Sequence, residues 1–154
     1  MIKLSDTILI STDPDTLFAW FADLPGHYRA WHPDHVSCRY EGAHGLRAGA
    51  RLHAEEYLHG RLHKLRFRIT RVAPSSLVEY RLGPGVRGAF RAEQGPTGTH
   101  FTAELEFGVG WPLLGPLLDF LLERLFSARI DAVRQHMKEE GVNLKRILES
   151  AAPI

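Results

Sequence analysis

The sequence has 154 residues, of which 44% are hydrophobic and 24% are charged, and its formal net charge is +1. This length and composition predict one globular domain with a sizeable core, and the balanced charge argues against nucleic acid or an anionic membrane as a partner. The single cysteine, Cys38, excludes an internal disulfide and fits a reducing compartment. The first residues lack the apolar stretch of a signal peptide, so we expect a cytoplasmic protein. A monomer or a homodimer is expected.

The N-terminal segment predicts a strand, a helix and a loop. The strand is indicated by apolar residues of one parity, at Ile2, Leu4, Ile8 and Ile10. Asp13 and Pro14 then predict the start of a helix, because aspartate caps free amides and proline suits the first helical position. Pro25-Gly26 is expected to end this helix, and a loop with a short helical turn should follow from His27 to Val36.

Six further strands are predicted from alternating apolar residues and glycine-containing turns. We expect them over Ser37–Tyr40, Ala50–Leu58, Leu62–Ala73, Leu77–Leu82, Gly88–Glu93 and His100–Val109. The basic residues between Arg61 and Arg71 alternate with apolar ones, which indicates the solvated face of a strand and not a nucleic-acid patch.

The C-terminal third changes to a helical period. The apolar segment Trp111–Leu122 contains two prolines and is short for a membrane span, so we expect an irregular lead-in. A long amphipathic helix is predicted from about residue 117 to residue 148. Its apolar stripe consists of Phe126, Ile130, Val133, Met137, Leu144 and Leu148.

This order of elements predicts an α+β fold with one domain over residues 1–150 and a short tail over residues 151–154. The long helix is the natural cover for the apolar face of the sheet, and a strongly bent sheet around one helix leaves a pocket. An apolar, aromatic wall suits a planar or lipidic small molecule, although such a set of residues also forms ordinary cores. The residues expected to line the pocket are Trp20, Tyr28, Trp31, His63, Phe67, Phe90, Phe101, Leu105, Phe107 and Met137.

The predicted C-terminal helix carries a candidate pair of metal ligands. At about 100° per residue, Glu140 falls between Met137 and Leu144 inside the apolar stripe, and His136 lies on its flank. A carboxylate in a core-facing stripe is costly unless it is paired or bound to metal. The alternative is a partly solvated pair, in which His136 and Glu140 interact one helical turn apart.

Two more ligands are expected from a strand and a loop. Strand parity turns Glu56 into the pocket and Glu55 outward, and a bulge would exchange them. A salt bridge to an arginine in the pocket is the other interpretation of Glu56. In the loop we favour His35 as the ligand and keep His32 in reserve. The alternative is that His32 only caps the turn while His35 bonds a backbone carbonyl.

The chain resembles the START-like helix-grip superfamily, also called the polyketide cyclase/dehydrase and lipid-transport (SRPBCC) superfamily. The resemblance covers almost the whole chain and is carried by the opening Ile8–Phe18, the strand Gly49–Gly60 with its paired glutamates, and the closing His136–Lys145. It implies a curved antiparallel sheet around a long C-terminal helix, an internal cavity and a small hydrophobic or aromatic ligand. This fold hosts carriers, receptors, cyclases and hydrolases, so it leaves the function open.

A narrower resemblance is to the zinc-dependent diacetylphloroglucinol hydrolase group, which cleaves a carbon–carbon bond next to an aryl ketone. That group uses two histidines and two glutamates, with a His-x-x-x-Glu pair on the last helix. The pair His136 and Glu140, the loop from His32 to His35 and the strand residue Glu56 fit this pattern. The resemblance implies a zinc site and hydrolysis next to a ketone.

Two other functions stay open. One is a metal-free carrier, binding protein or cyclase-like protein for a hydrophobic ligand. The other is an interaction protein that uses Trp111–Leu122 as a lid, a dimer contact or a membrane-facing surface.

Overall fold

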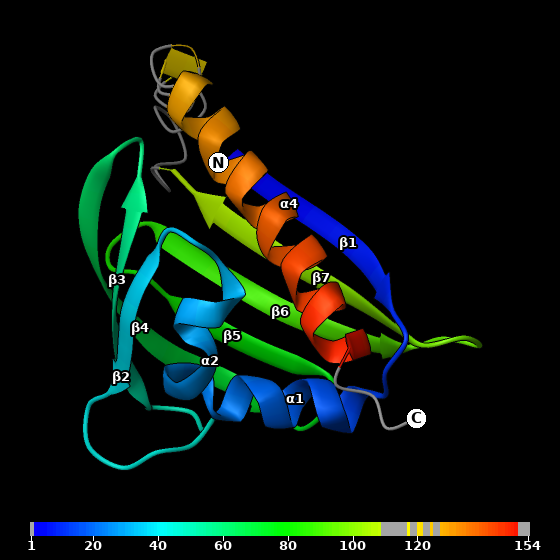
Figure 1. Cartoon of the computed structure of the whole chain (residues 1–154). Coiled ribbons are helices and arrows are strands. Elements are labelled where there is room, and N and C mark those ends of the chain that lie inside the picture. Colours follow the sequence, from blue (N-terminus) through cyan, green and yellow to red (C-terminus); the bar gives the residue numbers. More distant parts are fainter. Residues whose placement is uncertain (1, 109–116, 118–119, 122–123, 125–126, 151–154) are drawn as a thin grey trace.

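The computed structural model describes residues 2–108, 117, 120–121, 124 and 127–150. Seven strands form one antiparallel sheet in the order β1-β7-β6-β5-β4-β3-β2 (Figure 1). Their bounds are β1 Ile2–Ile10, β2 His35–Tyr40, β3 Arg51–Leu58, β4 Arg61–Ala73, β5 Leu77–Arg81, β6 Val86–Gln94 and β7 Thr99–Phe107. The helices whose bounds lie within the described residues are α1 Pro14–Ala22, α2 Leu24–Trp31 and α4 Ser127–Ser150.

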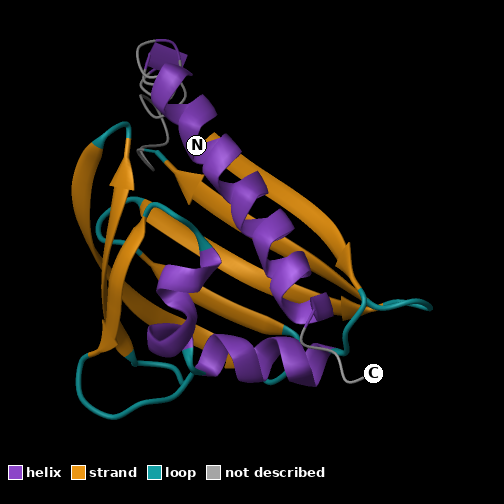
Figure 2. Cartoon of the chain, viewed as in Figure 1, coloured by secondary structure: helices purple, strands orange, loops and turns teal. Residues whose placement is uncertain are grey.

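The strands are consecutive hairpins, except that β1 pairs with β7. The sheet curves, and the long α4 crosses it beside β1 and β7, while α1 and α2 close the lower end (Figure 2). This arrangement confirms the predicted α+β helix-grip fold. No helix in the described ranges is long and apolar enough to cross a membrane.

The core lies between the concave face of the sheet and the helices α1, α2 and α4. Leu144 of α4, Leu17 of α1 and Ile10 of β1 are each fully enclosed, with 0% of their surface exposed. Leu144 belongs to the stripe predicted for the last helix. The part of that stripe at Phe126, most of the segment Trp111–Leu122 and the tail 151–154 lie outside the described residues.

The region between α1 and α2 differs from the prediction. The Asp13 cap is present, since its carboxylate accepts from the amide of Thr16 at 2.7 Å. However, Pro25 does not end the first helix: Asp23 separates the two helices, and Pro25 sits in the first turn of α2. Proline suits that position, because the first amides of a helix have no intrahelical partner. The predicted loop from His27 is therefore helical as far as Trp31.

Two features of the fold bring distant residues together. In the antiparallel pair of β2 and β3, His35 lies directly opposite Glu56, next to a bulge between His35 and Ser37. In addition, the indole of Trp31 donates a hydrogen bond of 3.0 Å to the backbone carbonyl of Glu140. This bond fixes the end of α2 against the middle of α4.

Candidate metal centre

Four side chains from β2, β3 and α4 converge at one point of the concave face. They are His35, Glu56, His136 and Glu140, and one ligand atom from each lies within 4.8 Å of the others. Three of these atoms form a tight triangle: His35 Nε2 is 2.9 Å from Glu140 Oε1 and 3.2 Å from His136 Nε2, and the latter two are 3.1 Å apart. Glu56 Oε2 lies 3.5 Å and 3.9 Å from the two imidazole nitrogens.

These separations fit zinc. With zinc–ligand bonds of about 2.0–2.1 Å, two ligand atoms of a tetrahedral site are about 3.3 Å apart. The triangle of two histidines and one glutamate has edges close to that value, and the same donor set occurs in catalytic zinc sites. Glu56, on the remaining side, is somewhat farther away. The residues present can therefore hold the ion.

The backbone sets which nitrogen of His35 faces the cluster. Its Nδ1 is 2.8 Å from the carbonyl oxygen of Tyr28. Because a carbonyl only accepts, Nδ1 carries the proton, and in the neutral ring the lone pair is on Nε2. The hydrogen bond from His35 to a backbone carbonyl is thus present, as one alternative expected. It does not remove His35 from the cluster, because it turns the other ring nitrogen, Nε2, toward the cluster. Metal-bound histidines are oriented in the same manner.

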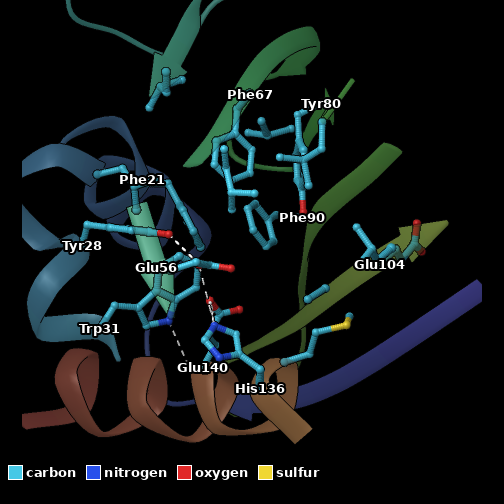
Figure 3. Close-up of a pocket in the computed structure, with 18 of the residues that line it drawn as sticks. Phe21, Tyr28, Trp31, Glu56, Phe67, Tyr80, Phe90, Glu104, His136 and Glu140 are labelled. Carbon is cyan, nitrogen blue, oxygen red and sulfur yellow. Dashed lines mark hydrogen bonds and ion pairs between the residues drawn. The ribbon is translucent and has the colours of Figure 1, made fainter. Parts of the chain in front are cut away.

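The carboxylate of Glu56 is also oriented by Tyr28. The Tyr28 hydroxyl donates to Glu56 Oε2 at 2.6 Å (Figure 3). The Tyr28 ring stacks on that of His35, with 3.9 Å between the ring centroids. Burial, followed by the charge and hydrogen bond of Glu56, raises the pKa of the Tyr28 hydroxyl, so it remains a donor. The predicted alternative for Glu56, an arginine in the cavity, is wrong: no lysine or arginine lines it in the described part of the chain.

The electrostatics of the cluster favour a cation. Burial alone would lower the pKa of His136, but the hydrogen bond and charge of Glu140 and the charge of Glu56 raise it. Burial alone would raise the pKa of Glu140, but hydrogen bonds with His136 and His35 hold it below its ordinary value. Two carboxylates and two imidazole lone pairs share one small volume, which needs either shared protons or a metal ion.

The reserve residues lie outside this cluster. His32 is buried, but the amide of Asp34 donates to its Nδ1 at 3.0 Å, and its Nε2 is 2.8 Å from Glu139. Both nitrogens of His32 therefore have partners, and the ring occupies the turn as one alternative expected. Glu55 is on the opposite parity of β3 and takes no part in the cluster. Strand parity thus separated Glu56 from Glu55 correctly.

The cluster opens into a cavity of about 140 Å³ under α4. Its walls are mainly apolar and aromatic, and Figure 3 shows Phe21, Phe67 and Phe90 on the side away from α4. Ligand cavities commonly combine such walls with a few convergent polar groups. The predicted lining residues that the cavity does contain are Tyr28, Trp31, Phe67, Phe90, Leu105 and Met137.

The family described as polyketide cyclase/dehydrase and lipid transport matches residues 1–141. The chain belongs to this family. Membership supports a protein with a ligand-binding cavity, in agreement with the cavity under α4. No curated protein matches the chain in sequence.

Solved structures share the fold. A Polyketide_cyc-like protein from Corynebacterium glutamicum is 21% identical, with 96% of this chain and 91% of that chain covered and a TM-score of 0.60. The protein TTHA0849 from Thermus thermophilus is 15% identical, with 98% and 100% covered and a TM-score of 0.70. Major latex-like protein 151 from Panax ginseng is 15% identical, with 85% and 97% covered and a TM-score of 0.61. At such identities the likeness concerns the fold alone.

Four of the predicted lining residues lie elsewhere, so these assignments were wrong. Trp20 and Phe101 are enclosed in the core behind the cavity, and Phe107 packs against the same core. His63 is exposed, although it lies opposite Glu56 and shares its face. The first residues of β4 are exposed on both faces, so parity alone could not bury His63.

Two polar residues of the cavity, Tyr80 and Glu104, were missed from the sequence. Tyr80 of β5 lines the wall together with its neighbours of the same parity, Val78 and Leu82. That parity was a usable signal, because the strand was predicted correctly and both neighbours are apolar.

Proposed function

We propose that this protein is a metal-dependent hydrolase that acts next to a ketone of a small aromatic or polyketide-like molecule. The observation that carries this proposal is the cluster of His35, Glu56, His136 and Glu140 at the wall of an apolar, aromatic cavity. A metal site that opens on a ligand cavity supports catalysis, whereas a structural site is closed off by its own ligands.

The three residues whose ligand atoms lie closest together would have a different role from Glu56, which lies farther away. His35, His136 and Glu140 form the tight triangle and would hold zinc. When bound, zinc supplies a Lewis acid that polarises a carbonyl oxygen or lowers the pKa of a water. Glu56 Oε2, which Tyr28 holds on the open side, either completes the ligand set or accepts the proton of an entering water.

The rest of the chain positions the reactants. The Trp31 indole anchors α4 at Glu140, and the Tyr28 carbonyl fixes the ring of His35. The aromatic wall accommodates a planar ring and excludes bulk water, which strengthens the electrostatic interactions of the cluster. In hydrolysis next to an aryl ketone, water gives its hydroxyl to the ketone carbon and a proton to the carbon that leaves. The products are a carboxylic acid and the shortened aromatic compound.

The test combines metal content with turnover. Purified protein is supplied with zinc, dialysed and analysed for metal, and aryl ketones are then screened for release of a carboxylic acid. We expect about one zinc per chain and turnover with at least one ketone. Absence of bound zinc in the wild type, or full turnover after the metal is removed by a chelator, contradicts the proposal.

Variants assign the ligands. Glu140→Gln should lose zinc, whereas Glu104→Gln should keep it, because the carboxylate of Glu104 bonds the exposed Arg91 at 3.0 Å outside the cluster. Glu56→Gln separates the two roles of this residue. Loss of zinc identifies Glu56 as a ligand, and retained zinc with lost turnover identifies it as the proton acceptor. Full activity of Glu56→Gln would exclude both roles.

A metal-free ligand-binding protein is the second candidate, and one observation favours it. In the described part of the chain, every fully buried side-chain nitrogen or oxygen already has a hydrogen-bond partner, including those of the cluster. The cluster can therefore be satisfied by shared protons. This candidate predicts that Glu140→Gln leaves ligand binding intact, and equal affinity of the wild type with and without zinc would support it.

A further inference from the structure

The hydroxyl of Tyr80 is a polar group inside the cavity without a protein partner. Tyr80 is only 8% exposed, and among the lining residues that the structure describes it is the one whose polar side-chain group makes no hydrogen bond. Figure 3 shows its oxygen pointing into the cavity, on the side that carries Glu56 and His136. No fully enclosed polar atom in the described ranges lacks a partner, so this oxygen is not fully enclosed by protein atoms.

The phenol ring is held in place by its surroundings. Tyr80 lies opposite Gly88 of β6, and a Cβ at Gly88 would come within 2.4 Å of the ring carbon Cζ and 2.5 Å of the hydroxyl oxygen. The missing side chain of Gly88 therefore makes room for the hydroxyl end of the ring. Phe67 and Phe90 pack against the same ring, each at 5.4 Å between centroids. A ring confined in this manner presents its hydroxyl in a fixed direction.

The hydroxyl acts as a donor at neutral pH. Burial, followed by the negative charges of Glu140 and Glu56, raises the pKa of Tyr80 above its ordinary value. A protonated phenol that is held in an apolar wall gains most from an acceptor oxygen on the bound molecule.

The size of the cavity limits what can carry that oxygen. Its volume is about 140 Å³, and an apolar cavity of about 150 Å³ accepts a single benzene ring. We propose that Tyr80 is a specificity-determining residue that donates a hydrogen bond to a ring oxygen of a single-ring, hydroxylated aryl ketone. This inference rests on the proposed function for the ketone, which would face the metal cluster while the ring oxygen faces Tyr80.

The experiment compares matched ligands on matched variants of the zinc-supplied protein. Acetophenone and its three monohydroxy isomers are titrated calorimetrically against the wild type, Tyr80→Phe and Tyr57→Phe. Tyr57 is the control, because it is 45% exposed and follows Glu56 in β3, so its side chain points to the other face of the sheet. Unfolding is measured for each variant, so that a loss of fold is seen separately.

We expect Tyr80→Phe to lower the binding affinity for at least one hydroxyacetophenone by about 2- to 12-fold, the effect of one neutral hydrogen bond. Acetophenone should bind both proteins equally, and Tyr57→Phe should behave as the wild type. Gly88→Ala should reproduce the selective loss, because the added methyl displaces the ring while the hydroxyl remains. Equal changes for hydroxylated and unsubstituted ketones, or no binding of any of the four to the wild type, would overturn the inference.

Failure of the inference can be told from failure of the proposed function. A protein that holds zinc and hydrolyses a ketone, but in which Tyr80→Phe does not change selectivity, contradicts the role of Tyr80 only. A protein that holds no zinc, but loses selectivity in Tyr80→Phe, contradicts the hydrolase and leaves the recognition by Tyr80 in place.

Discussion

Replacement of Glu140 by glutamine should abolish the stabilisation of the protein by zinc. Glu140 Oε1 lies 2.9 Å and 3.1 Å from the two imidazole nitrogens, so it is an essential corner of the triangle. At a free zinc concentration of about 100 times Kd, the wild type should gain about 2.7 kcal/mol of unfolding free energy. For a chain of this size, that gain corresponds to a rise in Tm of about 5–11 °C.

The expected loss in the variant follows from the same relation. Residues that merely support a metal ligand already contribute about 10- to 100-fold to affinity, so loss of the ligand itself should cost at least about 100-fold. At the same zinc concentration the variant then gains at most about 0.4 kcal/mol, or less than about 2 °C. The amide keeps the shape of the side chain, so the effect is specific to the charge.

Differential scanning calorimetry with and without zinc, each against a chelator blank, provides the measurement. Glu104→Gln is the matched control and should show the full rise in Tm, because its carboxylate pairs with Arg91 outside the cluster. The reasoning is refuted if Glu140→Gln shows the same rise as the wild type, since zinc would then bind elsewhere.

Three further predictions concern the support of the site and the sheet. Tyr28→Phe removes the hydrogen-bond donor to Glu56 and should lower the affinity for zinc about 10- to 100-fold, measured in competition with a chelator. Unchanged affinity would contradict this role of Tyr28. In the metal-free protein, despite burial, the hydrogen bond and charge of Glu140 raise the pKa of His136. The associated stability is therefore present below the ordinary pKa of 6.5 and is lost as the pH rises through the raised value. Urea unfolding of the wild type should show this loss and His136→Gln should not; parallel pH profiles would refute it. Arg68→Thr removes a positive charge that lies directly opposite Arg51 on β3 and Arg81 on β5. The loss of this repulsion should raise the unfolding free energy by about 0.2–1 kcal/mol. A lower unfolding free energy of the variant in urea would show that Arg68 is favourable there.

Local geometry made part of the site predictable from the sequence. The direction of a side chain on a strand or a helix depends on its position in the repeat, so parity turned Glu56 inward and helical phase placed Glu140 in the apolar stripe. Both side chains lie where this argument put them. The positions of the strands and of the long helix along the chain were predictable for the same reason, because alternation and the 3.6-residue period are local properties.

Tertiary contacts decided the rest. The sequence favoured His35 over His32 but held no argument that excludes His32, because the orientation of the two rings depends on the carbonyl of Tyr28 and on Glu139, which is far along the chain. Parity gave the correct face for His63 but could not show that the helices leave this end of the sheet uncovered. Trp20 was apolar and aromatic like the lining residues, and only its packing distinguishes core from cavity.

The most direct test of the metal site is a crystal structure of the zinc-supplied protein, with anomalous data collected on both sides of the zinc absorption edge. The account predicts one strong anomalous peak, about 2.0–2.2 Å from His35 Nε2, His136 Nε2 and a Glu140 oxygen. Ordered electron density for these residues without an anomalous peak between them, or a peak only at surface histidines, would contradict it.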